Sequence, residues 1–526
     1  MVEAQHPLVA TQRAGIEVQL PFGTHRICAV AAAPTAAEMR KLVRQAIRFS
    51  RTIELRLDWL ANDAQRQKLM AWLARSRVRA NFIATFRHRA AGGRYTGDIA
   101  GQLIVLKQAV ERGCSWCDVE METASRFRAE VLRALLGPVK LIISFHDFRR
   151  TPRKLTRLVR HLESWGADAV KVSAQAKDLG DALRVLSLAG RKRNRIVVPM
   201  GDAALPLRIL ALRQGSALAY APIGPATAPG QVPLEALRNL YRADRISRRT
   251  RVYGVIGDPI GHSLSPLLHN TGFQARRLDA VYLPFRVKDL SDFLESLAAI
   301  GIAGFSVTIP HKHAILRHLD DCDPLAIEIG AANTVVVRGG GKLYGYNTDF
   351  VGVLRALERR MPLAGSRVLL FGAGGAARAV AFALARGGSL VSVCARRPAQ
   401  ARALARRIGG EAIARRHLRS EFFDAVINAT PVGMFPHSDI SPLAPAELNC
   451  RMVMDLIYRP VKTRLLRLAE RRGIATISGV EMFLAQGTAQ WEIWTGLRAP
   501  QAAIRRAVLA VLRQEERAGL HAQVRR

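Results

Sequence analysis

The sequence has few acidic residues for its number of basic ones. Asp and Glu total 42 against 79 Lys and Arg, so the formal net charge is +37 at pH 7. Such an excess favours a polyanion, an anionic membrane surface or acidic substrates as partner. Aromatic residues make up only 6%, and the basic residues are spread along the chain apart from short runs such as 245–251. We therefore expect no nucleic-acid partner, because polyanion-binding modules usually combine basic runs with exposed aromatics or a groove-reading element.

Cysteine and long apolar runs are also scarce. The chain has 6 Cys, and Cys114 and Cys117 have no second pair to complete a zinc site, so we expect no metal. No apolar stretch reaches the roughly 18 residues that a membrane helix needs, and no secretory signal begins the chain. We therefore expect a soluble, cytoplasmic protein with no membrane partner.

A length of 526 residues exceeds one ordinary core, at roughly 100 to 200 residues per domain. Between residues 23 and 245, short β-branched runs alternate with amphipathic helical stretches, which predicts a (β/α)8 TIM barrel with chemistry at the C-terminal strand ends. The Arg-rich segment Leu240 to Arg251 is interpreted as a linker. The eight expected strands are Ile27 to Val30, Ile53 to Leu57, Asn81 to Phe86, Cys117 to Met121, Leu141 to Phe145, Ala169 to Val172, Ile196 to Pro199 and Leu218 to Ala221.

Polar residues stand at the expected ends of these strands. Glu54 and Arg56 are two apart and share a face, and Arg87 and His146 end two later strands. Lys171 lies between two valines. Because burial disfavours the charged form of a lysine, Lys171 is a candidate Schiff-base nucleophile. A buried ion pair with Glu54 explains the same lysine equally well.

The segment from Ser144 to Phe148, then Lys171, then Ala228 to Gln231, resembles type I 3-dehydroquinate dehydratase. The resemblance implies an imine between Lys171 and the ketone of 3-dehydroquinate, with His146 as acid and base. It also implies that Arg208 binds the carboxylate. The positions that would hold the substrate's ring and hydroxyls are Glu54, Arg56, Arg87, Thr227 and Gln231.

The chain departs from that family at one position. Ala91 stands where the family usually has the glutamate that orients the catalytic histidine. Either another acid such as Glu120 or Glu122 replaces it, or the dehydration is slower. We hypothesise a retained but slower activity.

The second half begins with Gly257 to Pro266, a Gly/Pro-rich turn that holds two serines. In order follow Ser306 to Lys312, Gly330 to Thr334 and Gly345 to Asp349. Together these segments resemble shikimate dehydrogenase. The resemblance implies a substrate-binding domain at 251–350, completed by 477–520, and a Rossmann domain at 351–476. It implies Lys312 and Asp349 as the catalytic pair, and substrate contacts from Ser263, Ser265, Thr308, Asn333, Tyr458 and Gln486.

A buried strand, a glycine-rich turn and an Ala-rich helix follow one another from Val368 onward, which is the context that supports a dinucleotide site. The turn supplies Gly372, Gly374, Gly375, Ala376 and Ala377. The next strand ends in Arg396 and Arg397, where an NAD enzyme would carry an acid, so NADP(H) is the expected cofactor. The family resemblance adds Asn428, Thr430 and Gly479 to the cofactor cleft.

The two halves together imply a bifunctional enzyme of the shikimate pathway, in aromatic amino acid and chorismate biosynthesis. A lyase would convert 3-dehydroquinate to 3-dehydroshikimate, and an oxidoreductase would then form shikimate with NADPH. The partners expected are these small molecules; the oligomeric state is left open. The alternatives are a weakened or lost dehydratase whose barrel serves as a scaffold or RNA-binding surface, and a dehydrogenase that prefers quinate.

Overall fold

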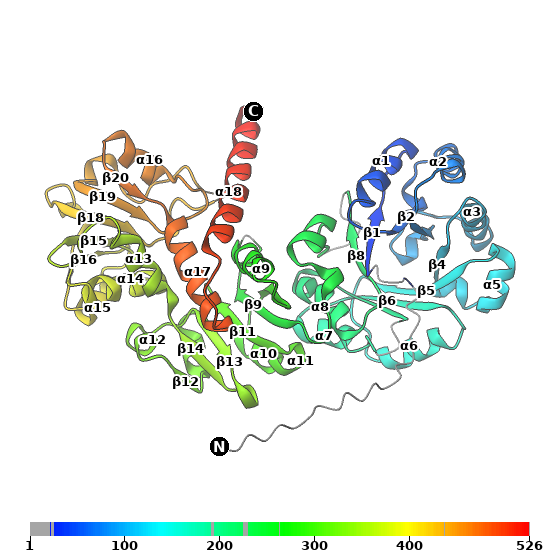
Figure 1. The fold of residues 1–526 in the computed structure, drawn as a ribbon, viewed down its shortest axis with the longest axis horizontal. Helices are drawn as coiled ribbons and strands as arrows, with labels where there is room; N and C mark the ends of the chain where they lie inside the picture. Colours follow the sequence, from blue (N-terminus) through cyan, green and yellow to red (C-terminus); the bar gives the residue numbers. More distant parts are fainter. Residues whose placement is uncertain are drawn as a thin grey trace, which may run out of the picture.

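The computed structural model describes residues 22, 26–190, 194–224, 230–261, 263–435 and 437–524. The chain forms two halves that lie side by side (Figure 1), the first built on one eight-stranded sheet and the second on two six-stranded sheets. Within the described ranges, no helix is long and apolar enough to cross a membrane.

The first half is a ring of parallel strands surrounded by helices. Neighbouring strands follow the order β7-β6-β5-β4-β3-β2-β1-β8, so the first strand, β1, pairs with the last, β8. Among the described residues the ring lacks only a paired ladder between β7 and β8. The strands are β1 (Ile27–Ala31), β2 (Thr52–Arg56), β3 (Asn81–Thr85), β4 (Trp116–Glu120), β5 (Lys140–Asp147), β6 (Ala169–Gln175), β7 (Arg195–Met200) and β8 (Ala219–Pro222).

The helices of the first half pack their apolar faces on the outside of this ring, so the predicted TIM-barrel fold is confirmed. Each predicted strand overlaps an observed one and differs from it by a few residues at the ends. The helices are α1 (Ala36–Ala46), α2 (Asp63–Arg75), α3 (Ile99–Glu111), α4 (Met121–Ala124), α5 (Ala129–Leu136), α6 (Leu155–Glu163), α7 (Leu179–Leu186) and α8 (Leu205–Gln214).

The second half starts with a mixed sheet of order β10-β9-β11-β13-β14-β12. Its strands are β9 (Arg251–Gly257), β10 (Ala280–Arg286), β11 (Ile302–Val307), β12 (Asp321–Cys322), β13 (Thr334–Val337) and β14 (Leu343–Tyr346). Its helices are α9 (Ser265–Ala275), α10 (Leu290–Glu295), α11 (Leu297–Ile300) and α12 (Pro324–Ile329). From the far end of the chain, α17 (Gly479–Thr495) and α18 (Gln501–Val524) return to this part; α17 packs on α9 and β11, and α18 on α9.

The third sheet is parallel throughout, with the order β17-β16-β15-β18-β19-β20. Its strands are β15 (Arg367–Phe371), β16 (Leu390–Cys394), β17 (Glu411–Ala412), β18 (Phe423–Asn428), β19 (Cys450–Asp455) and β20 (Ala475–Ile477). The helices α13 (Thr348–Leu357), α14 (Gly375–Arg386), α15 (Pro398–Arg407) and α16 (Arg464–Arg471) complete this Rossmann-like unit. The strand order changes direction beside β15, and ligands bind at such points in open α/β sheets.

The segment between the halves is packed against the core, although the sequence suggested a linker. Tyr241, Ala243 and Ile246 are all buried. Arg213 of α8 donates hydrogen bonds to the carbonyls of Thr250 (3.1 Å) and Ile300 (3.3 Å), and so joins the barrel to the second half. Apolar periodicity failed as a guide because a few well-placed side chains suffice to anchor a short connection.

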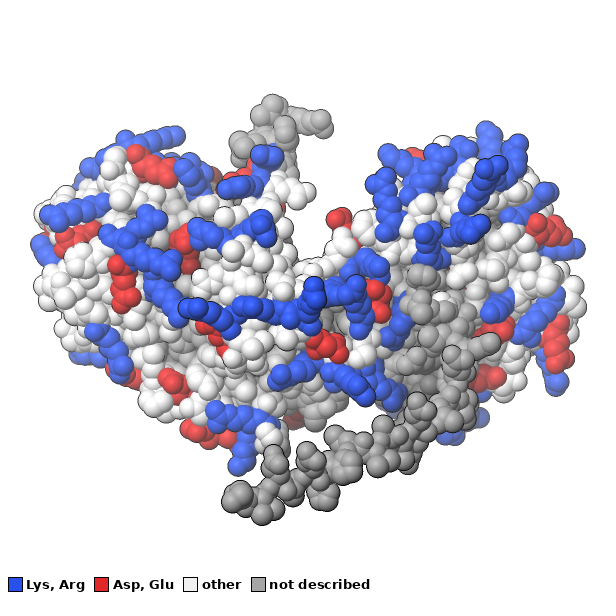
Figure 2. Space-filling model, viewed as in Figure 1, with Lys and Arg blue, Asp and Glu red and all other residues white. Residues whose placement is uncertain are grey.

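The basic residues are distributed over the surface rather than gathered in one run. On the face shown in Figure 2, Lys and Arg side chains cover both halves and clearly outnumber Asp and Glu. This distribution agrees with the charge balance of the sequence.

Candidate active sites

A small cavity of about 50 Å³ opens at the C-terminal ends of the barrel strands. Strand alternation brings polar side chains into it from β2, β5 and β6, and β7 is followed by α8, which adds Arg208. Seven of the eight predicted dehydratase residues line it: Glu54, Arg56, Arg87, His146, Lys171, Arg208 and Gln231. The eighth, Thr227, lies outside the described residues.

Lys171 is buried and lies between two carboxylates. Its Nζ is 3.0 Å from Asp118 Oδ2 and 3.5 Å from Glu54 Oε1, and it stands 4.0 Å from the centre of the Tyr220 ring. Thr85 donates a hydrogen bond of 3.0 Å to the same Glu54 oxygen. The ion pair expected as an alternative for Lys171 is therefore present, with a second acid beside it.

In the barrel, the sequence analysis missed Asp118. Its carboxylate pairs with Lys171 and with Arg87 (2.9 Å) and accepts a hydrogen bond from the Ser144 hydroxyl. The charges of Arg87 and Lys171 hold the pKa of this buried carboxyl well below its usual range. Asp118 and Glu120 are two apart in β4, and this spacing, used for Glu54 and Arg56, could have revealed it.

His146 contacts Arg87 instead of an acid. Arg87 Nη1 lies 3.0 Å from His146 Nδ1 and 3.1 Å from Ser144 Oγ. A guanidinium has only donors, so Nδ1 accepts and the neutral ring carries its proton on Nε2. Burial, with the nearby charges of Arg87 and Lys171, holds the pKa of His146 well below its usual value.

Neither acid considered as a replacement for the missing glutamate reaches His146. Glu120 Oε1 accepts the His88 backbone amide at 2.7 Å, and burial raises the pKa of Glu120 to about 7. Glu122 is exposed. Ala91 is buried. At the next residue, Gly92, the Phe148 ring packs against the backbone, and a Cβ added there would lie 2.2 Å from that ring.

The other two predicted substrate arginines are held by groups of the protein. Arg56 forms two hydrogen bonds with Asp58, at 2.9 and 2.8 Å. Arg208 Nε donates to the Pro199 carbonyl at 2.8 Å, and burial lowers its pKa to about 10. Both side chains still line the cavity.

In the second half, Lys312 and Asp349 form a close ion pair. Lys312 Nζ is 2.5 Å from Asp349 Oδ2, and Asn333 Nδ2 donates to Oδ1 of the same carboxylate at 2.9 Å. Lys312 stands in the loop after β11, and Asp349 in the first turn of α13. The structure thus brings together two residues that are 37 positions apart in the chain.

A buried chain of hydrogen bonds extends from this pair. Gln490 of α17 donates to the Asn333 carbonyl (3.1 Å) and accepts from Ser306 (2.8 Å), which contacts the Tyr282 hydroxyl at 2.6 Å. Gln490 was not expected. It lies one helical turn beyond the predicted Gln486. The Gln486 side-chain amide donates a hydrogen bond to the Phe483 carbonyl. Gln486 also packs on Gly352, where an added Cβ would lie 3.1 Å from the Gln486 Cβ.

The remaining predicted substrate residues lie in three separate segments of the second half. Ser265 begins α9, and its backbone amide donates to Ser263 Oγ at 3.2 Å. Thr308 directly follows β11. Tyr458 stacks on Phe483 with 4.6 Å between ring centres, and burial raises its pKa.

The glycine-rich turn lies between β15 and α14. Gly372 has a φ of +125°, which suits glycine, and a Cβ there would lie 3.1 Å from the Ala429 carbonyl oxygen. No atom lies within 4 Å of a Cβ added to Gly374, so its backbone is open to a ligand. Gly375, Ala376 and Ala377 form the first turn of α14. A helix N-terminus behind an open glycine turn suits a pyrophosphate.

Two arginines follow the neighbouring strand β16. Arg396 and Arg397 are exposed, and neither forms an ion pair with the carboxylates that the structure describes. Their guanidinium groups are therefore available to an anion at this edge of the sheet.

The other residues predicted for the cofactor are Asn428 and Thr430, at the end of β18 and just after it, and Gly479, at the start of α17. Asn428 Oδ1 accepts from Thr430 Oγ1 at 2.7 Å, and Asn428 Nδ2 donates to Asp455 at 3.0 Å. Burial raises the pKa of Asp455 to about 6. Gly479 begins α17, where a Cβ would lie 2.4 Å from the Leu456 carbonyl oxygen. In the described ranges, no group of three or more His, Cys, Asp or Glu side chains is arranged to hold a metal ion.

Comparisons with known proteins match both halves. Residues 27–248 match the type I 3-dehydroquinase family, residues 255–335 the shikimate dehydrogenase substrate-binding domain, and residues 479–509 the shikimate 5'-dehydrogenase C-terminal domain. The shikimate dehydrogenase (NADP(+)) of Methanothermobacter thermautotrophicus is 43% identical over 51% of this chain and 100% of its own length. A solved structure of Thermus thermophilus shikimate 5-dehydrogenase with NADP(H) and shikimate is 37% identical over 49% of this chain and 98% of its own, with a TM-score of 0.46.

One relative spans both halves. The chloroplastic bifunctional 3-dehydroquinate dehydratase/shikimate dehydrogenase of Arabidopsis thaliana is 37% identical over 473 residues, which cover 85% of this chain and 78% of that protein. The order of the two halves is therefore that of a known fusion. The chain belongs to the family of bifunctional 3-dehydroquinate dehydratases/shikimate dehydrogenases.

Proposed function

We propose that the barrel dehydrates 3-dehydroquinate to 3-dehydroshikimate and that the second half reduces this product to shikimate with NADPH. The observation that carries the proposal is that each half holds one lysine against a carboxylate: Lys171 with Asp118 and Lys312 with Asp349. In the barrel, Lys171 lines a cavity together with the residues that the family resemblance assigns to the substrate. In the second half Asn333, one of the residues so assigned, contacts Asp349.

In the barrel, the Lys171 ammonium first gives a proton to a neighbouring carboxylate, and the neutral Nζ attacks the ketone carbon. The same proton then leaves with the hydroxyl of the adduct as water, and a protonated imine remains. Glu54 and Asp118, which neutralise the ammonium in the resting site, stabilise this cation. The imine draws electrons from the adjacent carbon, whose proton His146 removes and then returns to the departing hydroxyl. Hydrolysis of the imine releases the product and restores Lys171.

The contact between Arg87 and His146 favours a slow form of this reaction. With Nδ1 held as acceptor, the proton of the neutral ring stands on Nε2. His146 becomes a base at Nε2 only when a proton moves to Nδ1 and Arg87 gives up its contact. Ala91 supplies no carboxylate to hold that proton. A weakened dehydratase is therefore the second candidate for the barrel, and this contact is the observation that favours it.

In the second half, Lys312 supplies the proton to the substrate oxygen as the ketone becomes an alcohol. Asp349 accepts a hydrogen bond from Lys312 and is held in turn by Asn333, so the ammonium is fixed in position. Ser263 and Ser265 bind the substrate carboxylate, and Thr308, Asn333, Tyr458 and Gln486 bind its ring and hydroxyls.

NADP(H) fits the residues around β15 and β16, and when bound it supplies the reducing equivalents. The open turn at Gly374 and the first turn of α14 suit the pyrophosphate, and Arg396 and Arg397 suit a 2′-phosphate. Asn428, Thr430 and Gly479 line the rest of the cleft. The name of the Methanothermobacter relative, which specifies NADP(+), supports the same choice.

A coupled assay from 3-dehydroquinate to NADPH oxidation tests both activities in the full chain. We expect Lys171→Ala to stop the coupled reaction and to spare reduction of added 3-dehydroshikimate. We expect Lys312→Ala to stop reduction and to spare dehydration. Mixing the two variants should restore the coupled reaction. Failure of the mixture, although each variant retains its other activity, would contradict the division of labour.

The imine has a separate test. Borohydride added with 3-dehydroquinate should leave a stable adduct on the peptide that contains Lys171, detected by mass spectrometry. Lys171→Ala should leave none. Dehydration without any adduct in the wild type would overturn the covalent mechanism.

A further inference from the structure

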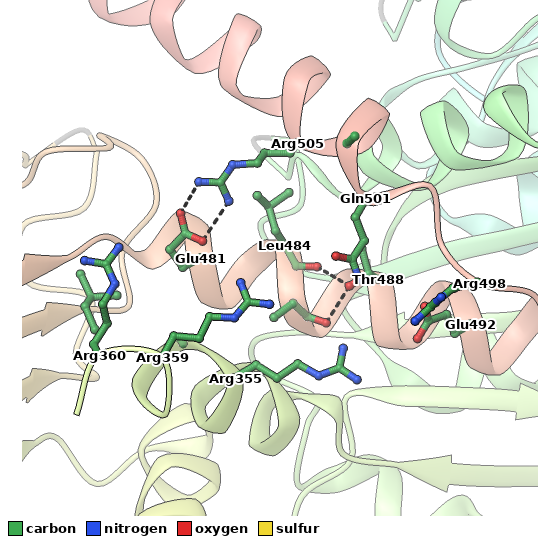
Figure 3. A pocket seen from close by; sticks show the side chains of 14 residues that line it. Arg355, Arg359, Arg360, Glu481, Leu484, Thr488, Glu492, Arg498, Gln501 and Arg505 are labelled. Carbon is green, nitrogen blue, oxygen red and sulfur yellow. Dashed lines mark hydrogen bonds and ion pairs between the residues drawn. The ribbon is translucent and has the colours of Figure 1, made fainter. Parts of the chain in front are cut away.

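One hollow in the second half lies away from both lysine pairs. It has a volume of about 780 Å³ and is bounded by the end of α13, one side of α17 and the start of α18 (Figure 3). Sites for small molecules usually measure about 300 to 1,000 Å³. The hollow is therefore large enough for an organic ligand of nucleotide size.

Five arginines surround this hollow: Arg355, Arg359, Arg360, Arg498 and Arg505. Two acids, Glu481 and Glu492, accompany them. Arg505 donates hydrogen bonds to both carboxylate oxygens of Glu481, at 2.9 and 2.6 Å (Figure 3). Hydrogen bonding by Arg505, with the charges of Arg360 and Arg359, lowers the pKa of Glu481. The carboxylates thus leave an excess of positive charge.

The other four guanidinium groups have no such commitment. Within the described residues, Arg355, Arg359, Arg360 and Arg498 form no ion pair and no side-chain hydrogen bond. Three of them come from one stretch at the end of α13, and Arg498 comes from the loop that leads into α18. Clustered like charges repel one another, and an anion placed among them would remove this repulsion and gain bidentate hydrogen bonds.

The base of the hollow is apolar. Ala356, Ile477 and Leu484 are buried and line it. The other uncharged lining residues are Ala485, Ala502, Thr488 and Gln501. Such a surface can bury the body of an organic molecule while the arginines hold its charged groups. A free inorganic ion would use only part of this site.

The hollow is separate from the catalytic cleft. Asp349 stands in the first turn of α13, whereas Arg355 lies six residues further on, at a rise of about 1.5 Å per residue. On α17, Leu484 and Gln486 are two positions apart, so their side chains point to nearly opposite sides of the helix. A ligand in the hollow would therefore contact the same two helices that carry Asp349 and Gln486, from the other side.

From these observations we infer that the hollow between α13, α17 and α18 is a second binding site, which takes a small organic anion with several phosphate or carboxylate groups. The shared chemistry is a set of closely spaced anionic oxygens on a body that can lie on Leu484 and its neighbours. The site is independent of the two activities proposed above.

Isothermal titration calorimetry on the full chain tests this inference. ATP, tripolyphosphate and citrate serve as probes at fixed ionic strength and without NADP(+), which is itself an organic anion with several phosphates. Each titration is repeated on Arg396→Ala, so that binding in the cofactor cleft is recognised by its loss in that variant. We expect saturable one-to-one binding of ATP, tighter than that of tripolyphosphate because the apolar base adds to it. Comparison of tripolyphosphate with citrate then separates phosphate from carboxylate preference.

Two triple variants decide whether binding belongs to this site. Arg355→Gln with Arg359→Gln and Arg360→Gln should weaken ATP binding at least tenfold. The matched control replaces Arg40 and Arg44 of α1, and Arg48 just beyond its end, with Gln, and should change the affinity less than twofold. Equal losses in both variants would show adsorption to a basic surface and overturn the inference, as would the absence of saturable binding. Tripolyphosphate binding as tight as ATP would overturn the role of the apolar base.

Whether NADP(+) itself binds is read from its own titration, so a failure of the proposed dehydrogenase is distinguishable from a failure of this site. The arginine variants should also retain the coupled reaction, because none of the three residues belongs to either catalytic set.

Discussion

The two lysine–carboxylate pairs both neutralise a lysine, but they differ in burial and in the number of charged neighbours. Lys171 is buried with two acids and beside Arg87, so four charged side chains compensate one another inside a cavity of about 50 Å³. Lys312 has one acid, keeps 17% of its side chain exposed, and is steadied by the neutral Asn333. In the buried set each charge depends on the others, because an uncompensated charge is costly in a medium of low polarity. Removing a neighbour of the more exposed Lys312–Asp349 pair should therefore cost less free energy.

The strongest test of this difference removes the acid that links the barrel charges. Asp118→Asn should lower dehydratase kcat by about 10³-fold or more, because it removes a carboxylate that stabilises the imine cation on Lys171. The broken buried pair should also lower the stability of the barrel by about 3 to 5 kcal/mol. Dehydrogenase activity of the same chain serves as the folding control. Glu122→Gln is the matched surface variant and should leave dehydration unchanged. Near-normal dehydration in Asp118→Asn would refute the interdependence of the buried set.

The second test uses the raised pKa of Glu120, about 7 in the folded protein against an ordinary value near 4.5. A carboxyl whose folded pKa is raised favours folding most below pH 4.5 and loses that contribution as pH rises towards 7. The loss is on the order of 3 kcal/mol for such a shift. Glu120→Gln cannot ionise, so its urea stability relative to wild type should rise between pH 4.5 and 8. A difference that does not vary with pH would contradict the assignment.

The third test concerns the open half. Arg396→Ala should weaken NADP(+) binding about 30-fold, since one charge-assisted hydrogen bond contributes about 2 kcal/mol. Affinity for NAD(+) should not change, because NAD(+) lacks the 2′-phosphate. Arg397→Ala is the neighbouring control that shows how the clamp is shared. A wild-type preference for NAD(+), measured as kcat/KM, would reject NADP(H) as the cofactor.

The smallest expected effect comes from adding an acid to the barrel site instead of removing one. Ala91→Glu should raise dehydratase kcat about tenfold. This is less than the roughly 10²- to 10⁴-fold of a positioned acid–base group, because the new carboxylate orients His146 and does not itself transfer the proton. The restored carboxylate would compete with Arg87 for His146 and favour a proton on Nδ1. The pH profile of kcat should shift with it. A lower kcat in a folded variant would mean that the site has adapted to alanine.

Much of the architecture could be predicted from residue patterns. Alternating β-branched runs and amphipathic stretches predicted the barrel, and a strand, a glycine turn and a helix predicted the Rossmann-like unit; both are observed. These patterns are local, and each reports the period of one element and the face that it buries. The identity of several site residues also followed from motifs, although their roles stay proposals.

The missed features all depend on contacts between distant segments. The spacing of Asp118 and Glu120 in β4 puts both on one face, but only the fold shows that Lys171, 53 residues later in the chain, meets Asp118 there. The segment before β9 was taken for a linker because its buried side chains show no periodicity. Gln490 was overlooked because its partners stand on β11 and β13.

The sequence by itself determined the element types and the order of the two halves, and it predicted many of the candidate site residues, because these follow from local periodicity and motif order. Only the tertiary structure decided which charges meet. It placed Arg87, rather than an acid, at His146, and it gathered arginines from α13 and α18 around one hollow. The physical reason is that the interaction between charges depends on their separation in space and on the polarity around them, and neither quantity can be read from positions along the chain.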